Sequence, residues 1–137
     1  MRTALQYVVS FVFIVQMYAA MVVMAIWWTP IAMVRRDAAH DAIKAYCSWV
    51  RRSAAILIGL RSEIRGAVPQ GEVLVAAKHQ SFFDIIMIVS AVPRPKFIMK
   101  KELLWAPIVG WYAKRIGCVA VDRGKRGQAI AKMVEAA

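Results

Sequence analysis

The first sixty residues contain two long runs of hydrophobic positions, and the first of them predicts a membrane helix. Residues 7–28 are almost wholly apolar, and no charged residue lies between Arg2 and Arg35. A helix over this segment rises about 33 Å, which is enough to cross the hydrocarbon core of a bilayer. Aromatic residues stand at both of its ends, where their rings favour the lipid headgroups, and Pro30 is expected to end the helix.

A cleaved signal peptide is the alternative interpretation of this segment. Only one basic side chain precedes it, its apolar stretch is longer than a typical signal sequence, and no clean Ala-x-Ala site comes before the basic cluster. We therefore expect a retained membrane anchor. The cations that follow the segment place the rest of the chain in the cytoplasm by the positive-inside rule; they are Arg35, Arg36, Lys44, Arg51 and Arg52.

The second run predicts an amphipathic helix over residues 41–60. Apolar residues recur at helical spacing from Ile43 to Leu57, and basic residues gather on another face. Such a helix either covers the core of the domain or lies in the membrane interface with its cations on anionic headgroups. We expect residues 1–58 to form a membrane-anchoring helix pair and residues 59–137 to form a separate cytoplasmic domain.

Beyond Gly59 the pattern of apolar positions becomes strand-like. Residues 60–66 alternate between apolar and polar, and residues 73–77 form a short apolar run after a turn. These two segments predict strands. Residues 85–89 predict a helix after the second strand, and residues 118–121 predict a further strand.

The overall composition narrows the classes of partner. Hydrophobic residues make up 61% of the 137 residues, which excludes a disordered chain, and 19 Lys and Arg against 8 Asp and Glu give a net charge of +11. This charge favours anionic lipid or a phosphorylated substrate. No nucleic acid is expected, because Trp105 and Trp111 stand among apolar neighbours instead of forming a stacking platform. Cys47 and Cys118 are widely spaced, so we expect reduced thiols and no metal site.

His79 and Asp84 are the candidates for catalysis. They lie at the corner between the second predicted strand and its helix, where the chain can fold His79 back over the first helical turn. A carboxylate beside a histidine fixes its tautomer and leaves the other ring nitrogen to take a proton from a hydroxyl. The alternative is structural, because Ser81 and Asp84 also form a capping-box pattern at the start of the helix.

The context of this pair resembles the glycerolipid acyltransferase family, in particular its bacterial 1-acyl-glycerol-3-phosphate acyltransferases. The segments that carry the resemblance, all between Gly59 and the C-terminus, are His79-Gln-Ser-Phe-Phe-Asp84, Lys100-Lys-Glu-Leu-Leu104, Pro107-Ile-Val-Gly-Trp111 and Gly117-Cys-Val-Ala-Val-Asp-Arg123. By this resemblance His79 is the general base and Asp84 orients it. Arg123 is the principal phosphate contact, and Lys100, Lys101 and Gly117 also bind the substrate.

The resemblance also implies a fold and a reaction. The fold is α/β, with an N-terminal membrane helix or helix pair followed by the first part of a twisted sheet packed by helices. The reaction transfers a fatty acyl group from acyl-CoA or acyl carrier protein to the free hydroxyl of lysophosphatidic acid. It yields phosphatidic acid for phospholipid biosynthesis, without a metal or cofactor. The expected location is the cytoplasmic face of a bacterial inner membrane, in contact with membrane lipids.

Two features qualify this expectation. The family's later motifs, which resemble Phe-Pro-Glu-Gly-Thr-Arg and a proline-containing apolar segment, are missing, and a predicted helix from Gly127 stops in mid-turn, so we expect a C-terminally truncated chain. The alternatives are a non-catalytic membrane-bound fragment or adaptor that docks on anionic lipid, and an acyltransferase that acts on another lysolipid.

Overall fold

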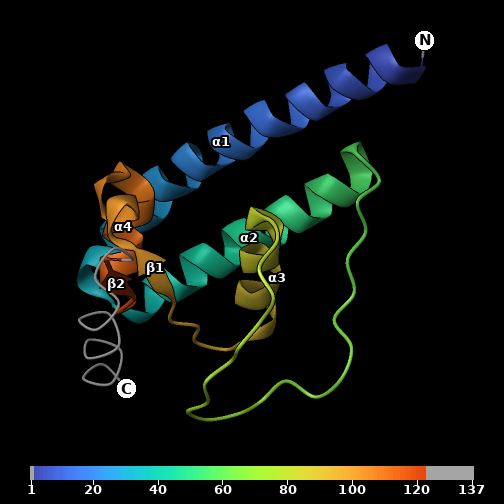
Figure 1. Ribbon diagram of the computed structural model, residues 1–137. Helices are drawn as coiled ribbons and strands as arrows, with labels where there is room; N and C mark the ends of the chain where they lie inside the picture. The colour runs from blue at the N-terminus through green and yellow to red at the C-terminus, as the bar shows by residue number, and fades with distance from the viewer. Residues whose placement is uncertain (1, 123–137) are drawn as a thin grey trace.

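The computed structural model describes residues 2–122. Two long helices run antiparallel and pack along one another, and the shorter elements gather on them (Figure 1). In chain order the elements are α1 (Arg2–Val34), α2 (Asp37–Leu57), α3 (Phe82–Ala91), β1 (Ile98–Lys100), the 3-10 helix η1 (Lys101–Trp105), α4 (Pro107–Arg115) and β2 (Val119–Val121).

The two predicted N-terminal helices are confirmed, and a shared core joins them to α3. In the described part of the chain, α1 is the one helix long and apolar enough to cross a membrane. The amphipathic face of α2 packs between α1 and α3 and therefore covers the core, which is the first of its two predicted roles. The buried side chains of this first core are Phe13, Met17, Cys47, Val50, Ala54, Ile86 and Val89.

The helix α1 continues through Pro30 to Val34, so the prediction that the proline ends it is wrong. A proline inside a helix removes one backbone hydrogen bond, and contacts with α4 offset that loss. The guanidinium of Arg115 donates from Nε to the carbonyl of Ala32 at 2.9 Å and from Nη2 to the carbonyl of Met33 at 2.8 Å. These carbonyls lie in the last turn of α1, where a helix leaves its acceptors unpaired.

The helix α2 begins and ends earlier than predicted. It starts at Asp37 and stops at Leu57, whereas the pattern indicated residues 41–60. Gly59 follows with φ +70, and the N–H of Leu60 donates to the carbonyl of Ala54 at 3.1 Å. A glycine with positive φ and a backbone hydrogen bond of this kind close many helices, and here they end α2 at Leu57.

The predicted strands at residues 60–66 and 73–77 are absent from the described structure. Residues 59–81 form a long connection that swings away from the helices (Figure 1). A strand is stable only when its backbone groups and one of its faces find partners. Within residues 2–122 the strand pairing involves β1 and β2 alone, and Leu74 in the middle of the second segment is 89% exposed.

The sheet is a parallel pair in which Lys100 of β1 stands opposite Val121 of β2. The strand at β2 was predicted and β1 was not. Parallel strands with flanking helices are consistent with the predicted α/β class.

A second core lies where α4 meets the turn between α1 and α2, and it consists of Ala32, Ala38, Ala39, Ala42, Tyr112 and Ile116. Both cores join residues on either side of position 58, and the predicted division into two domains there stays a prediction.

Candidate active site

The loop before α3 brings His79 and Asp84 together. Nδ1 of His79 lies 3.5 Å from Oδ2 of Asp84. The same Oδ2 accepts hydrogen bonds from the backbone N–H of Gln80 at 2.6 Å and of Ser81 at 2.8 Å. Asp84 therefore completes the capping box with Ser81 and faces the histidine at the same time. The two interpretations that the sequence left open are compatible, because one carboxylate both caps α3 and lies next to His79.

The electrostatics of the corner keep Asp84 ionised. The backbone N–H of Ser81, then that of Gln80, and then the neighbouring His79 lower the pKa of this carboxyl group below its usual 3.8. Its contribution to folding is complete above that usual value and is lost as the pH falls through the lowered pKa. At neutral pH a fixed anion therefore faces one ring nitrogen of His79. Such a histidine can accept a proton at its other nitrogen.

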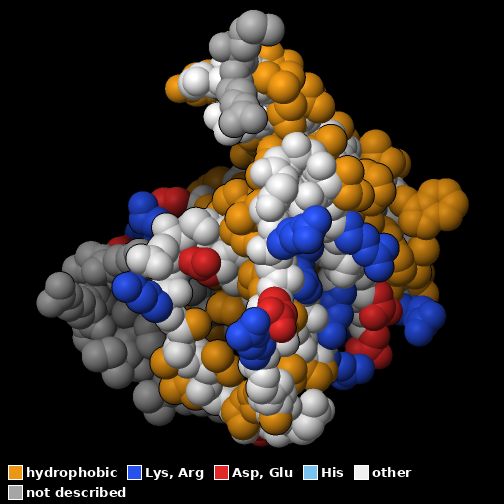
Figure 2. All heavy atoms as spheres, turned by 90° about the vertical axis from the view of Figure 1, so that its right-hand side faces the viewer, with side chains coloured by type: hydrophobic (Ala, Val, Ile, Leu, Met, Phe, Trp, Pro, Cys, Tyr) orange, Lys and Arg blue, Asp and Glu red, His pale blue; other side chains and the backbone are white. Residues whose placement is uncertain are grey.

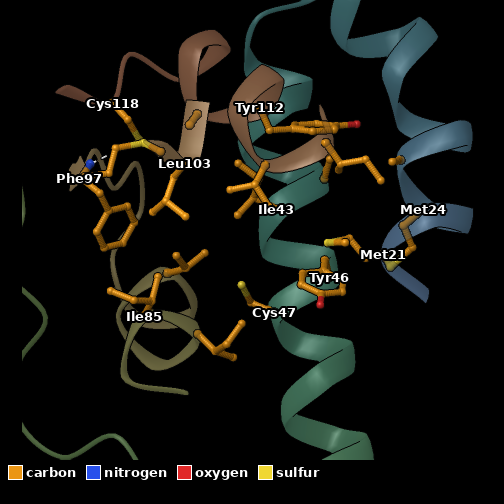
Figure 3. Close-up of a pocket in the computed structure, with 18 of the residues that line it drawn as sticks. Met21, Met24, Ile43, Tyr46, Cys47, Ile85, Phe97, Leu103, Tyr112 and Cys118 are labelled. Atoms are coloured by element: carbon orange, nitrogen blue, oxygen red, sulfur yellow. Dashed lines mark hydrogen bonds between the residues drawn. The ribbon is translucent and has the colours of Figure 1, made fainter. Parts of the chain in front are cut away.

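His79 borders an apolar cavity of about 370 Å³. Figure 3 shows its wall: Met21 and Met24 come from α1, Ile43 and Cys47 from α2, and Ile85 from α3. The end nearer the sheet is lined by Phe97, Leu103, Tyr112 and Cys118 among others, and Lys100 also lines the cavity. A ligand with a long apolar part and one reactive polar end suits this combination.

The two cysteines that line the cavity are neutral thiols. Burial raises the pKa of Cys47 to about 12 and also raises the pKa of Cys118. The sulfur of Cys118 accepts a hydrogen bond from the backbone N–H of Phe97 at 3.4 Å. Both cysteines are free, as the sequence predicts. A protonated thiol is a weak nucleophile, so neither cysteine is suited to attack a substrate.

The other predicted site residues lie near the sheet. Lys100 lines the cavity with His79, and its Nζ is 3.9 Å from a carboxylate oxygen of Glu102. Lys101 instead forms an ion pair with Asp122 at 2.5 Å. Gly117 has φ +79 in the turn between α4 and β2, so its backbone conformation accounts for a glycine at this position. Arg123, the predicted phosphate contact, lies outside the described residues.

Sequence reasoning missed the cavity and the contribution of α1 to it. Met21, Met24 and Ala25 belong to a segment that was interpreted as an anchor alone, yet they form part of the cavity wall. Their spacing places them on one side of a helix, but the whole segment is apolar and gives no signal that separates a side facing protein from a side facing lipid.

Comparison with known proteins places the chain in a family. Residues 60–137, more than half of the 137 residues, match the family described as Acyltransferase. The chain belongs to the Acyltransferase family. The matched region includes His79, Asp84, Lys100, Lys101 and the rest of the candidate site after α2, while α1 and α2 lie outside it.

Several curated relatives support this membership of the Acyltransferase family. A 1-acyl-sn-glycerol-3-phosphate acyltransferase alpha of Mus musculus is 38% identical over 88 residues, which cover 61% of this chain and 31% of the relative. A 1-acyl-sn-glycerol-3-phosphate acyltransferase of Pseudomonas aeruginosa is 23% identical over 95 residues, covering 68% of this chain and 37% of the relative. A lyso-ornithine lipid O-acyltransferase of Rhodobacter capsulatus is 34% identical over 77 residues, covering 56% of this chain and 28% of the relative.

The matches span about a third of the length of these curated relatives. No solved structure is significantly similar to this acyltransferase-family chain.

Proposed function

We propose that the protein transfers a fatty acyl group from a thioester to the free hydroxyl of 1-acyl-glycerol-3-phosphate, which gives phosphatidic acid. The observation that carries this proposal is the position of the His79–Asp84 pair at the edge of an apolar cavity. The family membership and the names of the relatives support acyl transfer to a lysolipid.

In the proposed reaction His79 is the general base. Asp84 accepts the N–H at Nδ1, so Nε2 takes the proton of the acceptor hydroxyl as that oxygen attacks the thioester carbonyl carbon. The carbon–sulfur bond then breaks, and the leaving thiolate receives the proton from the imidazolium. Atoms and charges balance without a metal or redox cofactor. The two backbone N–H groups on Asp84 keep its carboxylate in place throughout.

The cavity supplies the acyl subsite in this proposal. Its volume of about 370 Å³ falls within the range of roughly 300–1,000 Å³ that is typical of small-molecule sites. The neutral thiols of Cys47 and Cys118 make an acyl-cysteine intermediate unfavourable, which supports direct transfer from donor to acceptor. Direct transfer depends on holding the two reactants next to His79, so binding of the acyl chain contributes to rate by positioning.

The phosphate of the acceptor is the reason to prefer lysophosphatidic acid among lysolipids. Lys100 lines the same cavity as His79, and Arg123 comes two residues after the end of β2 in the sequence. An ammonium and a guanidinium are complementary to a phosphomonoester, and the guanidinium can bind two of its oxygens at once. Gly117 is proposed to contribute through the shape of its turn.

The acceptor assignment is tested by a panel of lysolipids. We expect the full-length protein to use 1-acyl-glycerol-3-phosphate at least about tenfold more efficiently, in kcat/KM, than lyso-ornithine lipid, because only the former presents a phosphomonoester to the two cations. The measurement is the rate of labelled product formation with each acceptor, with acyl-CoA and acyl carrier protein as separate donors. A preference for lyso-ornithine lipid would contradict the acceptor while leaving acyl transfer intact.

The arrangement of α1 and α2 bears on how the protein meets the membrane. Large hydrophobic side chains are exposed along the length of α1, among them Tyr7, Phe11, Tyr18, Val23 and Trp27. Figure 2 shows hydrophobic side chains along this part of the molecule, with a cluster of Lys and Arg below them. Such a surface is suited to the acyl chains and anionic headgroups of one leaflet.

A helix α1 that crossed the bilayer would carry α2 with it. Gln16, in the middle of the apolar segment, donates to the hydroxyl of Ser53 at 3.0 Å and accepts from the indole N–H of Trp49 at 2.9 Å. Arg52 is exposed on the same stretch of α2. A spanning α1 would place this arginine in hydrocarbon, which costs about 2.5–3.5 kcal/mol on insertion scales.

The cavity gives a second argument against a spanning α1. Met21 and Met24 belong to the apolar segment of α1 and line the same cavity as His79. A spanning α1 would therefore put His79 at the depth of the hydrocarbon core, out of reach of a water-soluble thioester donor. We therefore propose that the helix pair lies along the membrane surface with α1 facing the leaflet. In a bacterium this places the site on the cytoplasmic face of the inner membrane.

Protease protection distinguishes the two arrangements. In sealed inside-out vesicles we expect protease to remove epitope tags from both ends of the protein, because both ends of α1 lie on the cytoplasmic side. The measurement is loss of each tag on a blot, with the same tags in detergent as the control for cleavage. Protection of the N-terminal tag alone would show that α1 crosses the bilayer.

A further inference from the structure

The parallel pairing of β1 and β2 brings two segments of the candidate site to one edge of the sheet. Lys100, the last residue of β1, stands opposite Val121, the last residue of β2. The next residues, Lys101 and Asp122, therefore leave the sheet at the same edge. Register alone makes neighbours of two side chains that lie 21 positions apart in the sequence.

An ion pair joins these two residues. Nζ of Lys101 lies 2.5 Å from Oδ2 of Asp122, and the carboxylate raises the pKa of the lysine. Both side chains remain partly open to solvent, at 52% and 37% exposure. An ion pair with this much solvent access contributes little to folding, because water and salt screen it. We therefore do not expect the main role of Lys101 to be stabilisation of the fold.

The two adjacent lysines are placed differently. Lys100 lines the cavity that His79 borders, whereas the ammonium of Lys101 is engaged with Asp122. Asp122 is joined by one peptide bond to Arg123, the proposed phosphate contact. The position of Asp122 therefore limits where the chain can present the next residue, and Lys101, at the start of η1, forms an ion pair with Asp122.

We propose that Lys101 and Asp122 form a positioning pair. The pair fixes the chain where it leaves β2, so that Lys100, which precedes Lys101, and Arg123, which follows Asp122, bind the acceptor phosphate together. This inference rests on the proposed function. In it the second lysine of the Lys-Lys pair acts through Asp122 and does not itself contact the phosphate.

A double-mutant cycle tests the pair in the full-length protein. The variants are Lys101→Met, Asp122→Asn and the two combined, with Lys101→Arg as the conservative rescue. Each single variant should raise the KM for 1-acyl-glycerol-3-phosphate by about 3- to 5-fold, the upper end of what a partly exposed ion pair can supply, while kcat and the KM for the donor stay within about twofold. The combined variant should be no worse than either single one, and Lys101→Arg should stay close to wild type.

The variant Asp122→Asn separates this inference from direct phosphate binding by Lys101. If Lys101 were itself a phosphate ligand, removing the carboxylate would free its ammonium and leave the KM of the acceptor unchanged or lower. That result, or additive losses in the combined variant, would overturn the positioning role. Lys114→Met is the matched control, since it removes another exposed cation, on α4, and should leave both KM values unchanged.

A stability measurement completes the test. Melting temperatures of the variants should stay close to wild type, because the pair is partly exposed. A large fall in melting temperature with parallel losses in kcat and in both KM values would make the pair merely structural and overturn the inference. A wild-type protein that turns over no lysolipid would contradict the proposed function and this inference with it, whereas an active wild type with an unaffected Asp122→Asn variant contradicts the inference alone.

Discussion

Replacing His79 by alanine is expected to lower kcat for acyl transfer by about 10²- to 10⁴-fold, the usual contribution of a general base. No other titratable side chain in the described structure both lines the cavity and faces a carboxylate that fixes its tautomer. The KM values should change little, because the imidazole acts on the proton that moves in the transition state. The measurement is steady-state turnover of 1-acyl-glycerol-3-phosphate in vesicles.

The chain supplies matched controls for this variant. His40 is the only other histidine of the chain, lies in α2 and does not line the cavity, so His40→Ala should retain turnover once its folding is verified. Ser81→Ala removes the hydroxyl of the capping box but keeps the carboxylate, and should cost about 0.5–2 kcal/mol of stability with near-normal kcat. Asp84→Asn should lose turnover as well. An active His79→Ala variant would remove the histidine from the mechanism.

Replacing Gly110 by alanine is expected to destabilise the protein by about 2–3 kcal/mol, the upper part of the usual range for overpacking. An added Cβ would clash with the carbonyl oxygen of Leu104 and stand 2.6 Å from its carbonyl carbon. Both are backbone atoms of η1, so no side-chain rotation can relieve the clash. The displaced η1 also carries Lys101 and Leu103, and activity should fall with stability.

Thermal or urea unfolding in detergent measures this effect. Val109→Ala is the matched control in the same helix, since Val109 is partly exposed and the change removes atoms without creating a clash. It should shift stability by less than about 1 kcal/mol. A Gly110→Ala variant as stable as Val109→Ala would mean that η1 and α4 are not packed as closely as the structure has them.

Local patterns predicted the elements whose stability is local. The helical periodicity of α2 and the capping pattern of Ser81 and Asp84 appear in the structure because each depends on residues within one or two turns. The same reasoning failed at Pro30, where Arg115, more than eighty residues away, stabilises the end of α1. It also failed at residues 73–77, because a strand depends on a partner that its own sequence does not specify.

The candidate site divides in the same way. The pairing of His79 with Asp84 was accessible from the sequence, since a separation of five residues across the start of a helix suffices to bring them together, even though the strand predicted before His79 is absent. The cavity was not, because its wall combines α1, α2, α3 and the sheet. The different settings of Lys100 and Lys101 were not predictable either, since they follow from the register of β1 on β2.

The most direct test of the central claim is the transfer of label from an acyl thioester to 1-acyl-glycerol-3-phosphate by the purified full-length protein in vesicles. We predict one phosphatidic acid and one free thiol for each thioester consumed, at a rate that the His79→Ala variant loses. Vesicle binding without phosphatidic acid formation by the wild-type protein would contradict the account and favour a non-catalytic membrane adaptor.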